Sequence, residues 1–198
     1  MPAEVELKAS VPDWGGAVAR VERAGGALQF AGALEDRRYD SAERALTAVD
    51  HVLRLRVYRD ASGARAVLDF KGPTRIEGGY KVREEISTPC GDATATALLL
   101  ERLGYQVVKE IDREIRQYEC VGAIVRFERY PRMDDLVEVE GSPEAIEAAI
   151  TVLALPREAF TTERLLAFAQ RFEARTGTRA ATSAREAAGD YSRSRPDA

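Results

Sequence analysis

The sequence predicts an α+β fold in which an antiparallel β-sheet is covered on one face by helices. Strand-like segments follow one another in close order with short turns between them, as in an antiparallel meander. Amphipathic helical segments stand before, between and after these strands, and their apolar stripes need an apolar sheet face to cover. Several strands alternate apolar with charged residues, so the other face of the sheet is charged.

Eight segments carry the strand pattern. In the stretch 52–59, leucine and valine alternate with Arg54 and Arg56, which places the apolar and the charged side chains on opposite faces. A turn at 60–63 and the glycines at 78–79 separate this strand from the next two. The predicted strands are 4–8, 27–40, 52–59, 65–71, 80–87, 105–119, 121–129 and 137–140, and the alanine-rich stretch 41–49 is predicted as a loop or a short helix.

Four helices are predicted from apolar residues at helical spacing between capping signals. The first follows Pro12-Asp13, carries Trp14, Val18 and Val21 on one stripe, and ends at Gly25-Gly26. The others begin at the N-cap Asp92, at the N-cap Ser142 followed by Pro143, and at Thr161 or Thr162 ahead of the stripe Leu165, Leu166, Phe168, Ala169 and Phe172.

Length and composition indicate one soluble domain. The 198 residues are 45% hydrophobic and 31% charged, and we expect a domain over residues 1–175 and a disordered tail over 176–198, where large apolar residues are scarce. No apolar run is long enough for a bilayer and no secretory signal precedes the first strand, so we expect a cytoplasmic protein without a membrane partner. Cys90 and Cys120 are isolated, which indicates neither a disulfide framework nor a zinc site. The net charge of −4 argues against nucleic-acid binding.

Paired glutamates in the first and last strands indicate a site for a hard metal ion. Glu4 and Glu6 share one face of the first strand, and Glu138 and Glu140 share one face of the last. Neighbouring carboxylates repel each other, and a divalent cation removes that repulsion. Carboxylate oxygens suit magnesium, manganese or calcium better than the softer metals.

Basic pairs recur in the same way in other strands. Arg54 lies beside Arg56, and Lys81 lies beside Arg83. For a single strand, the simpler interpretation is a charged face turned to water. Because the pairs recur in strand after strand while the helices need the apolar face, we favour a sheet that curves and closes around a charged lumen. Such a lumen needs matching charges, and a polyanion with metal ions would supply them.

Six motifs in order give a resemblance to a known family. They are Glu4-x-Glu6-x-Lys8, Tyr39-Asp40, Leu53-Arg54-Leu55-Arg56, Lys71-Gly72-Pro73, Arg83-Glu84-Glu85 and Glu138-x-Glu140, with a basic strand around Lys109 and Arg113. The chain resembles the CYTH superfamily of triphosphate tunnel metalloenzymes over residues 3 to about 141, closest to bacterial class IV adenylyl cyclases and related triphosphatases. It departs at Glu128, where the family usually has Asp, and at Met133-Asp134, in place of Leu-Gly. The basic position is either Arg113 or Arg116, and parity with Lys109 favours Arg113.

The resemblance implies a closed eight-stranded antiparallel tunnel that binds a triphosphate with Mg²⁺ or Mn²⁺. The metal ligands would be Glu4, Glu6, Glu138 and Glu140, with Glu85 and Glu128 as further ligands or water-orienting groups. The phosphate clamps and catalytic residues would be Lys8, Arg54, Arg56, Lys71, Arg83 and Arg113, with Lys81 and Lys109 as further substrate-binding residues. Family members are often dimers, so a homodimer is also considered.

The nucleophile decides the reaction. Attack by the ribose 3′-hydroxyl on the α-phosphorus makes the protein an adenylyl cyclase that forms cyclic AMP and pyrophosphate, which is the first expectation. Attack by water makes it an inorganic or thiamine triphosphatase. A non-catalytic nucleotide or polyphosphate binder is the alternative of another class. Lys8, or a hydroxide held by the metal, is a better base than the lone His51, which has no motif around it.

Overall fold

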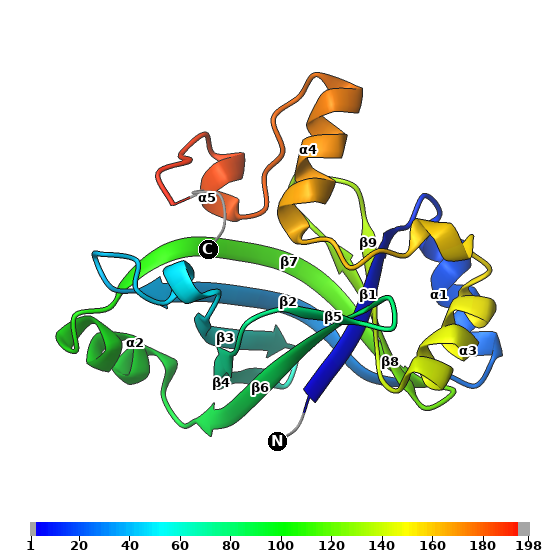
Figure 1. The fold of residues 1–198 in the computed structure, drawn as a ribbon, viewed down its shortest axis with the longest axis horizontal. Coiled ribbons are helices and arrows are strands. Elements are labelled where there is room, and N and C mark those ends of the chain that lie inside the picture. Colours follow the sequence, from blue (N-terminus) through cyan, green and yellow to red (C-terminus); the bar gives the residue numbers. More distant parts are fainter. Residues whose placement is uncertain (1–2, 194–198) are drawn as a thin grey trace.

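The computed structural model describes residues 3–193 and contains a closed barrel of eight antiparallel strands (Figure 1). The strands run in the order β1-β9-β8-β7-β2-β3-β4-β6, and pairing of β6 with β1 closes the barrel. This arrangement confirms the α+β fold and the closed eight-stranded tunnel. The barrel strands are β1 Ala3–Ser10, β2 Ala27–Asp40, β3 Val52–Asp60, β4 Gly63–Lys71, β6 Tyr80–Cys90, β7 Gln106–Cys120, β8 Ala123–Arg129 and β9 Leu136–Glu140. A ninth strand, β5 (Arg75–Glu77), was not predicted; it is three residues long and, among the described residues, pairs only with β6.

Strand parity decides which side chains face the lumen. In β1, Leu7 and Ala9 are almost fully buried beneath helices, whereas Glu4 and Glu6 point to the inside of the barrel. The register places Glu6 between Lys81 of β6 and a glutamate of β9. Side chains opposite each other in an antiparallel pair lie on the same face, so the charged faces of all these strands meet in one interior.

Helices cover the apolar outer face, as predicted. The α-helices are α1 Trp14–Arg23, α2 Ala93–Arg102, α3 Pro143–Leu153, α4 Leu165–Thr176 and α5 Ala184–Ala187, with 3₁₀ turns at Thr47–Val49 and Arg157–Ala159. Helices α1 and α3 pack together over β1, β8 and β9, and α2 packs on β3 and β4. The N-caps Asp13, Asp92 and Ser142 each accept a backbone hydrogen bond inside the first turn, which fixes where the first three helices begin.

Helix α4 begins later than predicted. Thr161 is not a cap but pairs with Lys8 of β1, with N···O distances of 3.0 and 2.9 Å in the two directions. The backbone stays extended up to Arg164, and the helix starts at Leu165. Burial of Phe168 then holds α4 against the barrel, where it contacts residues of β7, β9 and the turn after β8.

An apolar cluster fills one end of the lumen. Leu34, Tyr58 and Ile115 share the inward parity of their strands, and with Phe30 they form a cluster of buried side chains. The rings of Phe30 and Tyr58 meet edge to face at 5.2 Å, and the guanidinium of Arg65 lies 3.6 Å from the centre of the Tyr58 ring. A charged ligand therefore has to enter from the opposite end of the tunnel.

The segment after Thr176 is ordered as far as Arg193, which differs from the disordered tail expected from its composition. Ala181 forms a bridge with Arg132, and the backbone N–H of Asp112 donates to the carbonyl of Thr182 at 2.8 Å. Its small alanines are buried against β7, so little apolar volume is needed to fix it. The last five residues of the expected tail, 194–198, lie outside the described residues.

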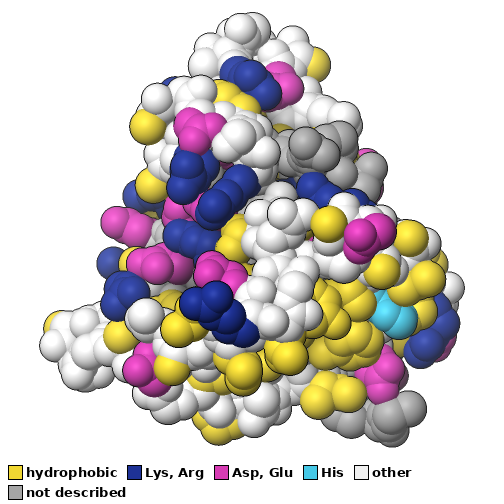
Figure 2. Space-filling view, turned by 90° about the vertical axis from the view of Figure 1, so that its left-hand side faces the viewer, with side chains coloured by type: hydrophobic (Ala, Val, Ile, Leu, Met, Phe, Trp, Pro, Cys, Tyr) yellow, Lys and Arg dark blue, Asp and Glu magenta, His cyan; other side chains and the backbone are white. Residues whose placement is uncertain are grey.

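The outer surface carries separate charged and apolar areas. On the face shown in Figure 2, Lys and Arg side chains gather with Asp and Glu side chains in one area and hydrophobic side chains gather in another. Leu98, Leu99 and Leu103 at and beside α2 are more than half exposed. Cys90 and Cys120 are free thiols. None of the helices within residues 3–193 is long and apolar enough to cross a membrane.

Candidate functional site

The lumen forms a charged cavity of about 100 Å³ in which cations outnumber carboxylates. Its basic lining residues are Lys8, Arg38, Arg54, Arg56, Lys71, Lys81, Arg83, Lys109, Arg113, Arg126 and Arg164. Its acidic lining residues are Glu6, Asp36, Asp50, Glu128, Glu138 and Glu163. Because β-strands from the whole circumference supply these side chains, closure of the barrel is what brings them together.

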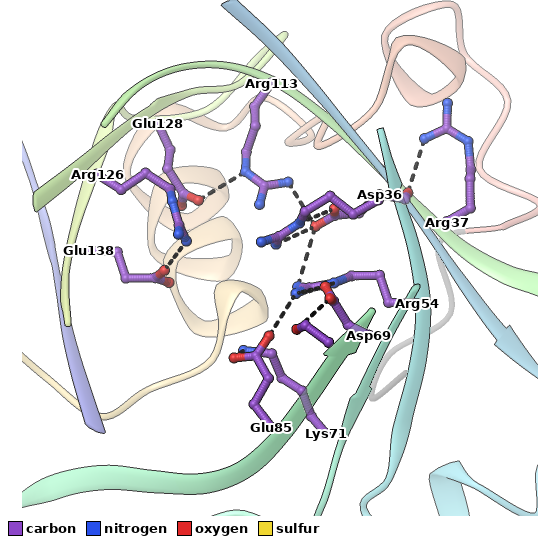
Figure 3. A network of polar contacts seen from close by, with 12 residues as sticks. Asp36, Arg37, Arg54, Asp69, Lys71, Glu85, Arg113, Arg126, Glu128 and Glu138 are labelled. Atoms are coloured by element: carbon purple, nitrogen blue, oxygen red, sulfur yellow. Dashed lines mark hydrogen bonds and ion pairs between the residues drawn. The ribbon is translucent and has the colours of Figure 1, made fainter. Parts of the chain in front are cut away.

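Asp36 of β2 joins three arginines at the centre of this network (Figure 3). Arg56 donates to both of its carboxylate oxygens, at 2.8 and 3.1 Å, and Arg113 donates to one of them at 3.1 Å. A guanidinium nitrogen of Arg54 lies 3.5 Å away. Burial alone would raise the pKa of Asp36, but the three guanidinium groups outweigh it and hold the pKa well below its ordinary value. Asp36 therefore stays ionised and fixes the arginine side chains.

A second cluster joins β3, β4 and β6. Asp69 accepts two hydrogen bonds from Arg54, at 3.0 and 2.6 Å, and one from Ser87 at 2.8 Å. Glu85 is half-buried between Arg54 at 3.6 Å and Lys71 at 3.2 Å, and Figure 3 shows its carboxylate turned toward them. Arg54 is thus shared between the Asp36 and the Asp69 clusters.

The two glutamates of β1 are each paired with a lysine. Lys71 donates to Glu4, and Lys81 donates to Glu6. All four side chains are largely buried, with at most 14% exposed. Each of these carboxylates therefore has a cationic neighbour.

Lys8 bridges the glutamates of β8 and β9. Its ammonium lies 2.8 Å from Glu138 and 3.4 Å from Glu128. Glu138 also accepts from Arg126 at 2.6 Å, and Glu128 accepts from the hydroxyl of Tyr130 at 2.7 Å. Burial would lower the pKa of Lys8, but Glu128 and Glu138 raise it well above its ordinary value. The two glutamates therefore favour the charged form of Lys8, and its role as a base stays a prediction.

Several guanidinium groups lie close to Arg38, together with the carboxylate of Asp36. Burial, followed by the repulsion of nearby Arg54, lowers the pKa of Arg38 to about 10, and Arg83 and Arg113 add to the effect. Arg83 itself donates to the backbone carbonyls of Gly72 at 2.7 Å and of residue 50 at 2.8 Å. A bound anion would relieve this crowding of guanidinium groups.

Glu140 lies close to other carboxylates of the lumen. Burial, the repulsion of nearby Glu4 and that of Glu138 raise the pKa of Glu140 to about 7. These carboxylates offer the hard oxygen donors that a divalent cation such as Mg²⁺ or Mn²⁺ prefers. Within residues 3–193, no three acidic, His or Cys side chains stand close enough together to hold a metal as they are placed. The donor chemistry fits a cation, and the carboxylates would have to leave their lysine partners to bind it.

The structure brings the predicted site residues together around one lumen. All eight predicted cations line the cavity, and so do three of the predicted carboxylates, Glu6, Glu128 and Glu138. Glu4 and Glu140 share the inward parity of these residues, and Glu85 touches Arg54 and Lys71. Arg113 is buried in the tunnel, whereas Arg116 is exposed on the outer face, so the parity argument was correct.

Several functional candidates were not predicted from the sequence. They are Asp36, Arg38, Asp69, Arg126 and Tyr130. The alternation of inward and outward side chains along a strand could have identified most of them. Asp36 and Arg38 alternate with outward-facing residues, and Arg126 lies two positions before the inward-facing Glu128.

His51 and Asp40, two residues named from the sequence, make contacts that support the wall of the tunnel. His51 lines the cavity but packs edge to face on Phe70 at 5.0 Å. The buried carboxylate of Asp40 accepts from the backbone of Ser41, Leu46 and Thr47 and from the Thr47 hydroxyl, which anchors the loop after β2. The Tyr39-Asp40 motif therefore supports the wall of the tunnel.

Several solved structures share this fold. A protein from Vibrio parahaemolyticus, provisionally called an adenylate cyclase, superposes with a TM-score of 0.72 at 18% identity over 83% of this chain and 96% of its own. The PH1819 protein from Pyrococcus horikoshii gives 0.69 at 24% identity over 82% and 96%. HpAC1 from Hippeastrum, for which a dominant triphosphatase activity is described, gives 0.62 at 18% identity over 90% and 97%.

Sequence comparison gives the family. No protein with a curated description matches the chain significantly. The CYTH domain model matches residues 2–162, which span the whole barrel and helices α1 to α3. The chain therefore belongs to the CYTH domain family.

Proposed function

We propose that this protein is a divalent-metal-dependent enzyme that cleaves a triphosphate inside the barrel. The observation that carries the proposal is the division of the lumen into a part where arginines gather around Asp36 and Asp69 and a part where the glutamates of β1, β8 and β9 lie among lysines and Arg126. A triphosphate with a metal ion would match both parts at once. A general anion binder would need the cations without the buried glutamates.

The arginines and lysines would hold the phosphates. Arg54, Arg56 and Arg113 are oriented by Asp36, so their guanidinium groups keep their positions before substrate arrives. Lys8, whose charged form Glu128 and Glu138 favour, would stabilise negative charge that develops on a phosphoryl oxygen. Charge neutralisation and positioning are the main requirements of phosphoryl transfer.

The glutamates would hold the metal. Glu4, Glu6, Glu138 and Glu140 are the proposed ligands, with Glu85 and Glu128 as further ligands or water-orienting groups. Mg²⁺ or Mn²⁺ bound there would neutralise phosphate charge and favour departure of the leaving group. Lys71 and Lys81, which now pair with Glu4 and Glu6, would then be available to phosphate oxygens.

Adenylyl cyclase is the narrower proposal. The ribose 3′-hydroxyl of ATP would give its proton to water and attack the α-phosphorus, the bond from this phosphorus to the oxygen that bridges it to the β-phosphorus would break, and pyrophosphate would leave. The fold shared with the Vibrio protein supports this reaction. Hydrolysis of inorganic or thiamine triphosphate is the second candidate, which the fold shared with HpAC1 favours.

The test incubates the purified protein with ATP, inorganic triphosphate or thiamine triphosphate, each with Mg²⁺ or Mn²⁺, and separates the products by chromatography. Cyclic AMP with pyrophosphate supports the cyclase, and orthophosphate supports a triphosphatase. The double variant Glu4→Gln, Glu6→Gln should lose the activity and keep its circular dichroism spectrum. Glu114→Gln is the matched control, because Glu114 is exposed on the outer face of β7, and it should keep full activity.

Binding without product would contradict the enzyme and favour the non-catalytic binder. If no triphosphate stabilises the protein against thermal unfolding, the charged lumen has another role, and the proposed function is wrong.

A further inference from the structure

An aromatic ring follows the arginines of β3 along the inside of the barrel. Arg54, Arg56 and Tyr58 stand at successive inward positions of this strand. Arg54 and Arg56 line the charged cavity, whereas Tyr58 belongs to the apolar cluster with Phe30 and Leu34. The step from Arg56 to Tyr58 is therefore the point at which the lumen changes from charged to apolar.

The Tyr58 ring contacts one guanidinium inside the tunnel and one outside it. The hydroxyl of Tyr58 accepts a hydrogen bond at 3.4 Å from Arg56, which is 6% exposed. The guanidinium of Arg65 lies 3.6 Å from the centre of the ring, and Arg65 is exposed. Tyr58 itself is buried, so its ring stands at the boundary between the lumen and the solvent at this end of the barrel.

The hydroxyl of Tyr58 lies on the arginine side of this boundary. Burial would raise the pKa of Tyr58, but the nearby guanidinium groups of Arg56 and Arg126 lower it. Arg126 also lines the cavity and is held in place by Gln117 at 3.0 Å. A phosphate bound by Arg56 and Arg126 would therefore lie close to the ring.

Apolar side chains close the space beside the ring. The Phe30 and Tyr58 rings meet edge to face at 5.2 Å, and Leu34 and Ile115 are almost fully buried. A phosphate placed among these side chains would lose its hydration without gaining hydrogen-bond donors, which is unfavourable for a charged group. A phosphate chain that enters from the opposite end should therefore stop here.

We propose that the Tyr58 ring is the floor of the tunnel and limits how far a phosphate chain can enter. The inference rests on the proposed function and adds a residue that determines specificity. The terminal phosphate of the substrate would stop at Arg56, and this stop would set which phosphorus lies beside the glutamates. Without the ring, the lumen would be continuous with Arg65, and a longer polyphosphate could pass.

The test asks whether a phosphate chain in the tunnel can reach Arg65. Inorganic triphosphate and a long-chain inorganic polyphosphate are titrated calorimetrically in EDTA, which prevents metal-dependent cleavage. Tyr58→Ala and Tyr58→Leu remove the ring, Tyr58→Phe keeps it, and Arg65→Gln removes the cation beyond it. Arg59→Gln is the matched control for Arg65→Gln, because Arg59 is about half exposed and pairs with Glu35 on the outer face of the barrel.

We expect Arg65→Gln to affect neither chain more than Arg59→Gln does, because the ring keeps phosphates away from Arg65. When Tyr58 is replaced by alanine or leucine, the affinity for the long chain relative to triphosphate should rise about tenfold, as expected for a new contact between charged groups. Adding Arg65→Gln to either variant should remove this gain. Tyr58→Phe should keep the wild-type ratio of the two affinities.

Three results would overturn the inference. They are a loss of long-chain binding in Arg65→Gln beyond that in Arg59→Gln, an unchanged ratio in the variants without the ring, and a gain in Tyr58→Phe equal to theirs. Circular dichroism shows whether the variants without the ring are folded, and the comparison of Arg65→Gln with the wild type needs neither of them. If the wild type binds inorganic triphosphate neither in EDTA nor with Mg²⁺, the proposed function fails as well, so the two failures are distinguishable.

Discussion

Replacing Asp36 by asparagine tests whether the arginines of the tunnel are held by a buried counter-charge. Asparagine keeps the size of the side chain but removes the charge that neutralises Arg54, Arg56 and Arg113. Asp36 is 1% exposed, so water cannot replace the lost carboxylate. Breaking a buried ion pair by removing one member costs about 3–5 kcal/mol, because the remaining charge is left uncompensated.

The expected loss is large enough to measure by thermal unfolding. For a chain of this size each 1 kcal/mol shifts the melting temperature by about 2–4 °C, so Asp36→Asn should melt about 6–20 °C below the wild type. Inorganic triphosphate should stabilise the variant more than the wild type, because the ligand supplies the negative charge that the mutation removed. The difference in melting temperature between the wild type and Asp36→Asn should also become smaller as pH falls. Because the pKa of Asp36 is lowered in the folded protein, its charge contributes full stability above the ordinary aspartate range and loses that contribution at lower pH.

The neighbouring residue provides the control. Glu35 points to the outer face of β2 and pairs at 2.8 Å with Arg59, which is about half exposed. A surface pair contributes about 0–1 kcal/mol, so Glu35→Gln should melt within a few degrees of the wild type. The reasoning is refuted if Asp36→Asn is destabilised no more than Glu35→Gln, or if triphosphate stabilises both variants equally.

Three further outcomes are expected. The buried Asp40 has a lowered pKa because hydrogen bonds from the following loop outweigh its burial. Its contribution to the free energy of unfolding is therefore present above the ordinary aspartate range and is lost as pH falls. In denaturant unfolding measured from about pH 3 to 7, Asp40→Asn should therefore lose less stability on acidification than the wild type. Asp112→Ala removes contacts to Arg37 at 2.6 Å and to the amide of residue 184 at 2.9 Å; hydrogen exchange should rise in residues 177–193 and stay slow in the barrel strands, and equal protection would contradict this anchoring. The homodimer suggested by the family resemblance predicts a sedimenting species of about twice the 21.8 kDa chain mass, and a single species of chain mass would exclude it.

The side chains that face the lumen could be predicted because the alternation of the two faces along a strand is a local property. Glu4, Glu6 and Lys8 alternate with apolar residues, so their common face followed from spacing alone. The same rule chose Arg113 over Arg116 correctly. Helix starts with a capping side chain, such as Asp92 and Ser142, were also predicted correctly, since the cap lies within four residues of the groups it binds.

Properties that depend on register could not be predicted in this way. Asp36 touches arginines from two other strands, up to 77 positions away in the sequence, so its role depends on how β2 aligns with β3 and β7. The late start of α4 has a similar cause, because Thr161 is held in a bridge to β1. Composition failed for residues 177–193, where ion pairs and buried alanines replace the large apolar residues that usually indicate order.

The pairing of glutamates with lysines predicts that metal and triphosphate bind cooperatively. Lys71 neutralises Glu4 and Lys81 neutralises Glu6, so a ligand that binds either partner has to displace the other. If a cation binds the glutamates, the lysines become available to the phosphates, and the affinity for triphosphate rises. Triphosphate must then raise the affinity for the cation by the same factor. Lys81→Met should therefore bind Mn²⁺ alone more tightly than the wild type, because Glu6 has lost its competitor, and should bind triphosphate more weakly. Mn²⁺ titrations followed by electron paramagnetic resonance measure the first effect without any turnover. Equal Mn²⁺ affinity in the two proteins would show that Glu6 does not hold the cation, and the proposed set of metal ligands would have to be changed.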